Sequence, residues 1–317
     1  MAGTVRRAKG TGSALITARL RCLQTVLVSV CIGVVSPGAM GSGLGRAWRR
    51  GGARVVATVA GRSARTVRLA EAAGLELVPD LDAVVAAAQI VVSVGPPDRA
   101  VEIAGSIAAS ARRAGVTPLV AELNAVSPMT VSRIAADVLA PAGIDVVDGA
   151  ISGPPPKDAG RTIMYLSGPS AGRIAGLDAP DLDARVVGDR LGQASAIKMC
   201  TASVYKGFTG LLLQALLTAQ AYDCVELVLA DLADVYRDID EWAGRRLAMA
   251  ASKSSRWVGE MREIAATQAA AGARPELLDA MARVWEMVAE TPLAKHTPEE
   301  AAGDQPLAAV LAELRRR

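Results

Sequence analysis

The chain has 317 residues, of which 51% are hydrophobic and 21% charged, a composition typical of a folded globular protein and not of a disordered one. Its net charge of +3 and its aromatic content of 3% argue against a polyanionic partner and against rows of stacked aromatic rings, so no nucleic-acid partner is expected. One histidine, His296, and four cysteines without a CxxC pair predict no metal site and no disulfide framework, and they favour a reducing, cytoplasmic compartment.

The first 27 residues have two interpretations. Arg6, Arg7 and Lys9 precede an apolar stretch that ends in VLVSVCIGVV (26–35), as they would in a secretory signal peptide. The uninterrupted apolar run is too short to span a bilayer, and cleavage after it would remove the first strand expected below. The sequence therefore favours a loose N-terminal extension over residues 1–27, with no membrane partner, and export is the alternative.

From Val28 onward, short β-branched runs alternate with Ala-rich amphipathic stretches. The runs expected to form strands are SVCIGVV, ARVVATV, LELVP, IVVSVG, PLVAEL, GIDVVDGAI and TIMYLSG, with helices between them over 43–50, 64–73, 81–88 and 100–113. Continuous apolar strands that are separated by helices of about ten residues indicate a parallel sheet covered on both faces. The predicted fold class is α/β, with an NADP-binding Rossmann domain over residues 28–189 built on a doubly wound parallel sheet.

The pattern changes near Gly188, and no strand is expected from Leu191 onward. Residues 190–317 predict an all-α C-terminal domain for substrate binding and dimerisation. Its helices are expected over 193–231 (as one or two), 238–251, 256–271, 275–289 and 306–316. The stretch 193–231 is apolar nearly all round, and such a helix has to be covered by its own domain or by a second subunit. A homodimer is therefore expected.

The turn after the first strand fills the G-x-G-x-x-G frame of a dinucleotide-binding loop, with Ser36 at the first position. Gly38 would let the backbone approach a pyrophosphate, and Gly41 would let the next helix pack close to the strand. Free N–H groups at the start of that helix would then hold the phosphates. The candidate cofactor-binding residues of this turn are Ser36, Pro37, Gly38, Ala39, Met40 and Gly41. A plain β–α turn is the alternative.

The segment after the second strand predicts which cofactor binds. NAD-binding folds usually place an acidic residue here for the ribose hydroxyls, whereas this chain has Arg62, Ser63 and Arg65. Guanidinium and hydroxyl groups suit the 2′-phosphate, so NADP(H) is expected in preference to NAD(H). Alternatively, Arg65 and Arg68 are only exposed helix residues.

Three further strand ends carry candidate ligand-binding groups, because ligands of open α/β sheets bind at the carboxyl ends of the strands. These candidates are Val94, Gly95 and Pro96 for the cofactor, Asn124 for cofactor and substrate, and Ser127, Ser152 and Gly153 for the substrate. Ser152 and the Gly153 N–H are suited to a carboxylate. Ser127, followed by proline, could also simply cap the next helix.

Lys198 lies near the start of the long apolar helix, among Ala, Ile, Met and Cys. Desolvation lowers the pKa of a lysine, which makes the amine a usable general acid or base. A lysine that snorkels at a domain boundary is the alternative. Thr201 and Tyr205 lie close to Lys198 on the helix and are expected to contact substrate. Lys206 is a second candidate, although it should point roughly 80° away from Lys198 by helix periodicity.

Together these motifs resemble the β-hydroxyacid dehydrogenase and 6-phosphogluconate dehydrogenase superfamily, over about residues 31–289. The superfamily patterns G-x-G-x-M-G, D-x-P-V-S-G-G and G-x-G-x-x-x-K-x-x-N are similar to segments 36–41, 148–154 and 192–201. Here Ser36 and Ala194 replace glycines, Pro154 replaces the last Gly, and Thr201 stands where Asn is expected. The stretches IKMCTASVYKG and RWVGEMREIAAT resemble a phosphogluconate-dehydrogenase-like subgroup whose C-terminal domain has no settled function.

The resemblance implies an NADP-dependent oxidoreductase that transfers hydride between nicotinamide and a small hydroxyacid-like substrate, with Lys198 as general acid/base. An imine reductase has a similar architecture, although such enzymes commonly carry Asp or Tyr at the lysine position. The substitutions at Ser36 and Thr201 also allow a non-catalytic NADP-binding protein. Substrate identity, reaction direction and any decarboxylation stay open at this point.

Overall fold

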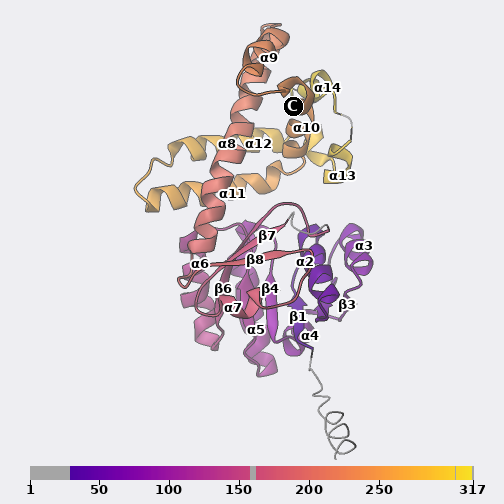
Figure 1. The fold of residues 1–317 in the computed structure, drawn as a ribbon, viewed down its shortest axis with the longest axis vertical. Helices are drawn as coiled ribbons and strands as arrows, with labels where there is room; N and C mark the ends of the chain where they lie inside the picture. Colours follow the sequence, from indigo (N-terminus) through magenta and orange to yellow (C-terminus); the bar gives the residue numbers. More distant parts are fainter. Residues whose placement is uncertain (1–28, 158–161, 304, 316–317) are drawn as a thin grey trace, which may run out of the picture.

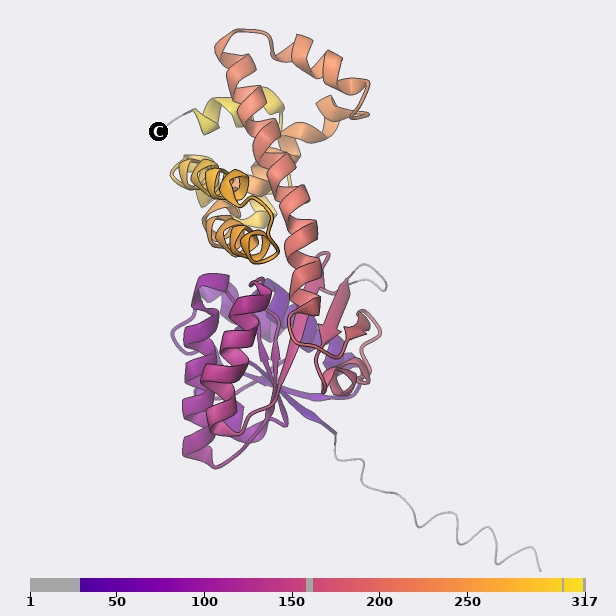
Figure 2. The same cartoon turned by 90° about the vertical axis from the view of Figure 1, so that its left-hand side faces the viewer.

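The computed structural model describes residues 29–157, 162–303 and 305–315, and the prediction for residues 1–27 lies outside this range. Figures 1 and 2 show two parts that follow one another along the long axis: a sheet flanked by helices, and a separate group of helices. Helix α8 (Gln193–Ala221) runs from the sheet through the whole helical group. The N-terminal Rossmann sheet and the all-α C-terminal part predicted from the sequence are both present.

Eight strands form one sheet in the order β3-β2-β1-β4-β5-β6-β7-β8. They are β1 (Cys31–Val34), β2 (Arg54–Ala57), β3 (Glu76–Leu77), β4 (Ile90–Ser93), β5 (Leu119–Glu122), β6 (Val146–Ser152), β7 (Ile163–Ser167) and β8 (Asp183–Gly188). Neighbouring strands are parallel throughout, except for β6 and β7, which are antiparallel. The first six strands therefore have the order of a doubly wound dinucleotide-binding sheet.

The sheet differs from the prediction beyond β6. Strand β7 is antiparallel to its neighbour because only residues 153–162 connect the two strands, and a parallel crossover needs a dozen or more residues. Strand β8 was not expected at all. It is an edge strand whose residues are all half-buried or exposed, so its sequence lacks the continuous apolar run of a central strand.

Helices cover both faces of the sheet. Helices α2 (Ala39–Arg50), α3 (Ala64–Ala72) and α7 (Ala171–Ala175) pack on one face, around the buried Trp48, Leu44 and Ile174. Helices α4 (Leu81–Ala87), α5 (Ala100–Ala114) and α6 (Pro128–Arg133) pack on the other, together with the π-helical turn Ile134–Leu139. The helices expected over 64–73, 81–88 and 100–113 are confirmed to within one residue at each end.

The helical part contains α8, α9 (Val225–Ala233), α10 (Ile239–Ala251), α11 (Ser254–Ala270), α12 (Glu276–Ala289), α13 (Pro298–Ala301) and α14 (Leu307–Leu314). The stretch 193–231 thus forms two helices. Helices α11 and α12 lie side by side across α8, and their core contains Trp257, Trp285 and Leu213. Within the described ranges, no helix is long and apolar enough to cross a membrane.

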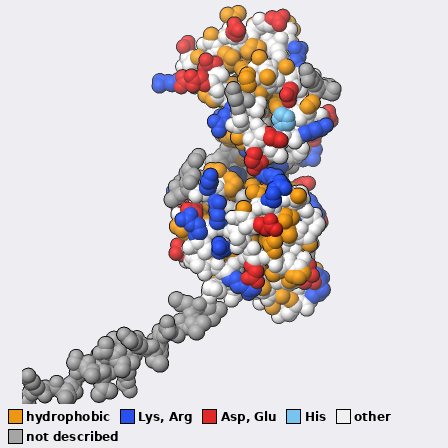
Figure 3. Space-filling model, turned by 90° about the vertical axis from the view of Figure 1, so that its right-hand side faces the viewer, with side chains coloured by type: hydrophobic (Ala, Val, Ile, Leu, Met, Phe, Trp, Pro, Cys, Tyr) orange, Lys and Arg blue, Asp and Glu red, His pale blue; other side chains and the backbone are white. Residues whose placement is uncertain are grey.

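The cover expected for the apolar helices is incomplete within one chain. No residue of α9 is buried, and large hydrophobic side chains of α8, α9 and the segments that follow these two helices are exposed. These side chains are Val204, Leu211, Tyr222, Leu227 and Val235. Figure 3 shows hydrophobic side chains gathered on the surface of the helical part. The chain's own helical part therefore covers α8 and α9 only in part.

Candidate active site

A cavity of about 580 Å³ lies where segments that follow β4, β5 and β6 meet helices α8 and α11. It opens at the carboxyl edge of the sheet, next to β1 and β4, where the strand order reverses and open α/β sheets bind their ligands. The predicted site residues that line it are Met40, Val94, Gly95, Asn124, Ser152, Gly153, Lys198, Thr201 and Tyr205. The fold therefore brings together segments that are 158 residues apart in the chain, from Met40 to Lys198.

The remaining predicted residues lie outside this cavity. Ser36, Pro37, Gly38, Ala39 and Gly41 form the turn between β1 and the first turn of α2. Arg62, Ser63 and Arg65 follow β2 at the start of α3, Pro96 precedes a 3-10 turn, and Ser127 begins α6. All of these segments lie at the carboxyl ends of the strands.

The β1–α2 turn has the geometry that a pyrophosphate requires. A Cβ at Gly41 would collide with the carbonyl oxygen of Ser36, so only glycine allows this close packing of helix on turn. A Cβ at Gly38 would meet nothing within 4 Å, so the space in front of the helix is open. The first turn of α2 holds no acidic side chain that would oppose the positive end of the helix dipole. These residues fit the phosphates of a dinucleotide.

Lys198 points back to the sheet from the second turn of α8. Its Nζ donates a hydrogen bond of 2.8 Å to the carbonyl oxygen of Ile151 in β6. Burial, and to a smaller extent the positive charge of Arg256, lower the pKa of this amine. The side chain is thus a desolvated amine in the cavity wall beside Ser152, which is the environment of a general acid or base.

Asp148 determines where α8 begins. Its Oδ2 accepts hydrogen bonds from Gly192 N (2.9 Å), Ser195 N (3.0 Å) and Ser167 Oγ (2.8 Å), and its Oδ1 accepts one from Ser195 Oγ (2.6 Å). A buried carboxylate in this position satisfies N–H groups that have no partner within the helix and complements the helix dipole. Because Asp148 belongs to β6, it fixes the helix that carries Lys198 against the strand whose carbonyl accepts from Lys198.

Asn124 connects the ends of β4 and β5 at the floor of the cavity. Its Oδ1 accepts from Gly95 N, its Nδ2 donates to Ser93 Oγ (2.9 Å), and its backbone N donates to Glu122 Oε1 (3.0 Å). Glu122 is completely buried, and burial raises the pKa of its carboxyl to about 7. Both ends of the Asn124 amide are thus engaged within the protein, and its contact with a ligand stays a prediction.

Ser127 is a helix cap and an anchor between the two parts of the chain. Its Oγ accepts from Thr130 N (3.2 Å). Ser127 therefore caps α6, which is the alternative that the following proline indicated in the sequence. Glu263 of α11 accepts from Ser127 N (2.7 Å) and from Thr130 Oγ1 (2.8 Å) through the same oxygen. Ser127 therefore holds α11 above the sheet and does not line the cavity.

The wall formed by α11 was missed by the sequence reasoning. Lys253, Arg256, Trp257 and Glu260 line the cavity together with Lys206 of α8. Lys206, the second lysine candidate of the sequence, also lines the cavity, because a long lysine side chain can reach it in spite of a direction at Cα that differs from that of Lys198 by roughly 80°. The spacing of Lys253, Arg256 and Glu260, three and then four residues apart, places them on one helix face and was the signal available.

The positively charged side chains of this wall lie around a single carboxylate, that of Glu260. Among the described residues that line the cavity, Glu260 is the only acid. It forms a buried ion pair with Lys206 and a second ion pair with Arg256, whose Nε lies 3.0 Å from Glu260 Oε1. The Nζ of Lys206 also lies 5.3 Å from the ring centroid of Trp257. Burial and the nearby charges of Lys198, Arg256 and Lys253 lower the pKa of Lys206. Four Lys and Arg side chains against one acid among the described lining residues suit an anionic ligand.

Thr201 and Tyr205 lie further out on α8. The Thr201 hydroxyl donates to the carbonyl oxygen of Ile197 (3.0 Å) on its own helix. The Tyr205 ring lies edge-on to Trp257 and under the guanidinium of Arg246, 4.7 Å from its carbon. Both side chains are at the rim of the cavity, and their predicted contact with substrate is untested. No group of His, Cys, Asp and Glu within the described residues is arranged to hold a metal ion.

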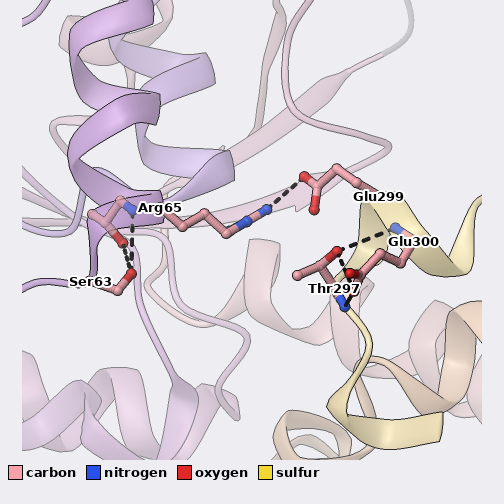
Figure 4. A network of polar contacts seen from close by, with 6 residues as sticks. Ser63, Arg65, Thr297, Glu299 and Glu300 are labelled. Carbon is pink, nitrogen blue, oxygen red and sulfur yellow. Dashed lines mark hydrogen bonds and ion pairs between the residues drawn. The ribbon is translucent and has the colours of Figure 1, made fainter.

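The segment after β2 lies beside a second part of the helical group (Figure 4). Ser63 Oγ accepts from Thr66 N (3.3 Å) and caps α3, and Arg62 is exposed. Arg65 forms an ion pair of 2.7 Å with Glu299 of α13. Glu299 also lines a second cavity, of about 400 Å³, between α2, α3 and residues 154–157.

Comparisons with known proteins agree with this architecture. Residues 219–288 match the family model described as Domain of unknown function (DUF1932). MTH1747, a conserved protein of unknown function whose structure is described as similar to 3-hydroxyacid dehydrogenases, is 24% identical with a TM-score of 0.60, over 87% of this chain and 100% of that chain. No curated protein matches the chain in sequence.

Two enzymes of known activity have the same fold. A 3-hydroxyisobutyrate dehydrogenase from Mycobacterium tuberculosis is 19% identical with a TM-score of 0.62, over 90% of this chain and 99% of that chain. A reductive aminase from Aspergillus terreus, solved with NADPH and ethyl levulinate, is 17% identical with a TM-score of 0.51, over 86% of this chain and 98% of that chain. The chain therefore has the fold of these solved 3-hydroxyacid dehydrogenase-like proteins, as its motifs predict, and residues 219–288 match the DUF1932 model.

Proposed function

We propose that the chain is an NADP(H)-dependent oxidoreductase that exchanges hydride with a small hydroxyacid-like substrate. The observation that carries the proposal is that Lys198, a desolvated amine, and Met40, which follows the pyrophosphate-type turn, line the same cavity. The basic wall made by Lys253 and Arg256 suits a substrate carboxylate. The dehydrogenase from Mycobacterium tuberculosis, which has the same fold, acts on such an acid by its name.

The cofactor would supply hydride when bound, and this chain's residues would hold it. The turn at Gly38, with the free N–H groups of α2, fits the pyrophosphate. Arg62, Ser63 and Arg65 at the start of α3 have the chemistry for a 2′-phosphate, which supports NADP(H) over NAD(H). Val94, Gly95 and Pro96 follow β4 at the same edge of the sheet and would wall the cofactor.

Lys198 would move the proton. Its Nζ already donates to Ile151 O, and a substrate oxygen beside Ser152 would lie within its reach as acceptor or donor. Ser152 and Gly153 would orient the substrate carboxylate, with Asn124, Thr201 and Tyr205 around it. Ser127 would act from outside the cavity by fixing α6 and α11.

Substitutions at Gly38 and Gly41 test cofactor binding and fold stability separately. In a Gly38→Ala variant we expect the free energy of unfolding to stay within about 1 kcal/mol of the parent, because the new Cβ meets no protein atom. Its affinity for NADPH should fall by about tenfold or more, about 1.4 kcal/mol, because the Cβ enters the open space in front of α2. Gly41→Ala should instead destabilise the fold by about 1–3 kcal/mol through the clash with Ser36. Fluorescence titration and chemical denaturation measure both; unchanged NADPH affinity in Gly38→Ala contradicts this turn as the phosphate site.

An imine reductase is the second candidate function, because the reductive aminase from Aspergillus terreus has the same fold. An assay with NADP⁺ and a panel of 3-hydroxy acids, run beside NADPH with cyclic imines, decides between the two. Turnover of hydroxy acids supports the proposal, and turnover of imines alone replaces it. Tight NADPH binding without turnover in either arm would indicate a non-catalytic NADP-binding protein.

A homodimer through α8 and α9 is part of the proposal. Their exposed side chains, Leu211 and Leu227 among them, are the surface that a second copy would cover. Sedimentation equilibrium is expected to give twice the mass of one chain, and Leu211→Asp with Leu227→Asp should shift it to one chain. Leu277→Asp, on an exposed position of α12, is the matched control and should leave the dimer intact. A compact monomer of the parent protein contradicts the proposal.

A further inference from the structure

Arg65 and Glu299 join the two parts of the chain at the place where a dinucleotide fold reads the adenosine ribose. The Arg65 guanidinium lies 2.7 Å from Glu299 Oε1, although the two residues are 234 positions apart in the sequence. Figure 4 shows Arg65 reaching from the first turn of α3 to the carboxylate of α13. The contact therefore exists only because the helical part folds back over the Rossmann sheet.

The position of this pair matters for cofactor binding, because the segment after β2 has no acidic residue of its own. Folds that bind NAD carry an acidic residue after the second strand, which accepts from the ribose hydroxyls. The corresponding segment here, residues 58–66, contains no Asp or Glu. Glu299 supplies a carboxylate beside this segment from another part of the chain.

Helix α13 is held firmly enough for Glu299 to act as a built-in partner of Arg65. Thr297 N donates to Glu300 Oε2 (2.7 Å), and Glu300 N donates to Thr297 Oγ1 (3.3 Å), so the helix start is closed by a capping box. Ala301 is completely buried on the other side. The hydrogen bond from Arg65 also lowers the pKa of Glu299, so the carboxylate stays ionised beside the guanidinium at neutral pH.

We infer that Glu299 is a specificity-determining residue for the cofactor: it competes with a 2′-phosphate for the Arg65 guanidinium and so reduces the preference for NADP(H) over NAD(H). The inference rests on the proposed nucleotide site. A phosphate carries about two charges and accepts two parallel hydrogen bonds from arginine, so it can displace a single carboxylate. Because Arg65 is one-third exposed and Glu299 mostly exposed, the competition is screened, and its effect on the binding constant should be about two- to fivefold.

The test compares nucleotide affinities of the full chain and its Glu299→Gln variant. Dissociation constants for NADPH and NADH are measured by fluorescence titration at low ionic strength. The variant should bind NADPH about two- to fivefold more tightly, with NADH changed by less than about twofold. The gain should shrink at 0.5 M salt, where the screening length falls to about 4 Å.

Two matched variants isolate the pair. In an Arg65→Ala background, Glu299→Gln should no longer alter NADPH affinity, because the group for which the carboxylate competes is gone. Glu76→Gln removes the same charge from another exposed pair, with Arg54 at the amino ends of the strands, and should leave both affinities unchanged. An NADPH-to-NADH ratio that Glu299→Gln does not change, or changes equally in the Arg65→Ala background, overturns the inference. A parent protein that binds neither nucleotide would instead sink the proposed function.

Discussion

Replacing Lys198 by alanine is expected to lower turnover by about 10²- to 10⁴-fold, the range of a lost general acid or base, and to leave NADPH affinity nearly unchanged. The reason is that Lys198 Nζ lies beside Ile151 and Ser152 in the cavity wall, whereas the pyrophosphate would be held by the β1–α2 turn. Steady-state kinetics with the substrate found by the assay above, and titration with NADPH, measure the two quantities. Lys295→Ala removes an exposed lysine of the helical part outside the cavity and should change neither.

The pH profile gives Lys198 a signature that a structural role would not give. If the amine donates a proton during carbonyl reduction, kcat/KM is full while Lys198 is protonated and falls as the pH rises through its pKa. Because burial lowers that pKa, the fall should come below the ordinary range of a lysine, and Lys198→Ala should abolish it. Undiminished turnover in Lys198→Ala, or the same pH limb in the variant and the parent, removes Lys198 from the mechanism.

Replacing Asp148 by alanine is expected to have the largest effect on stability. The change leaves four donors without their acceptor in a fully buried place: Gly192 N, Ser195 N, Ser195 Oγ and Ser167 Oγ. Each buried donor that loses its partner costs about 1–3 kcal/mol, and partial rearrangement leaves an expected loss of about 3–5 kcal/mol in the free energy of unfolding. Denaturant unfolding followed by circular dichroism measures it.

Asp148 also has controls that separate charge from hydrogen bonding. Asp183→Ala removes a half-buried aspartate of the edge strand β8, paired with Arg185, and should cost less than about 0.5 kcal/mol. Asp148→Asn keeps one acceptor oxygen and should lie between Asp148→Ala and the parent. A stability of Asp148→Ala equal to that of Asp183→Ala would contradict the role of Asp148 as the anchor of α8.

Local sequence determined most of the Rossmann part because its signals are short-range. Strands β1, β2, β4 and β5 each consist mainly of consecutive apolar residues, and the helices between them show a 3.6-residue period, so each element can be predicted from its own residues. The glycine at position 41 likewise follows from a local requirement, the closeness of α2 to the turn. Edge strand β8 was not predicted, because an edge strand buries few side chains and therefore has no continuous apolar run in its sequence.

Only part of the site could be predicted from the sequence, because only part of it lies in short local motifs. Lys198, Ser152 and Gly153 stand in motifs of their own, and the cavity contains all three. The opposite wall, with Arg256, Trp257 and Glu260, carries no short motif, and its nearness to Lys198 depends on how α11 docks above the sheet. Ser127 shows the reverse case, since its place at a strand end made it a candidate while its hydrogen bonds assign it to α6 and α11.

The sequence by itself determined the class of fold, and it named the turn at Gly38 and Gly41 and Lys198 as candidate site residues, because backbone conformation, helix period and desolvation depend on neighbouring residues. Only the tertiary structure decided that Asp148 starts α8, that Glu260 of α11 pairs with Lys206 of α8, and that Glu299 meets Arg65. Those contacts join residues that are 44 to 234 positions apart. Their partners are chosen by packing between helices and sheet, and no local pattern encodes that choice.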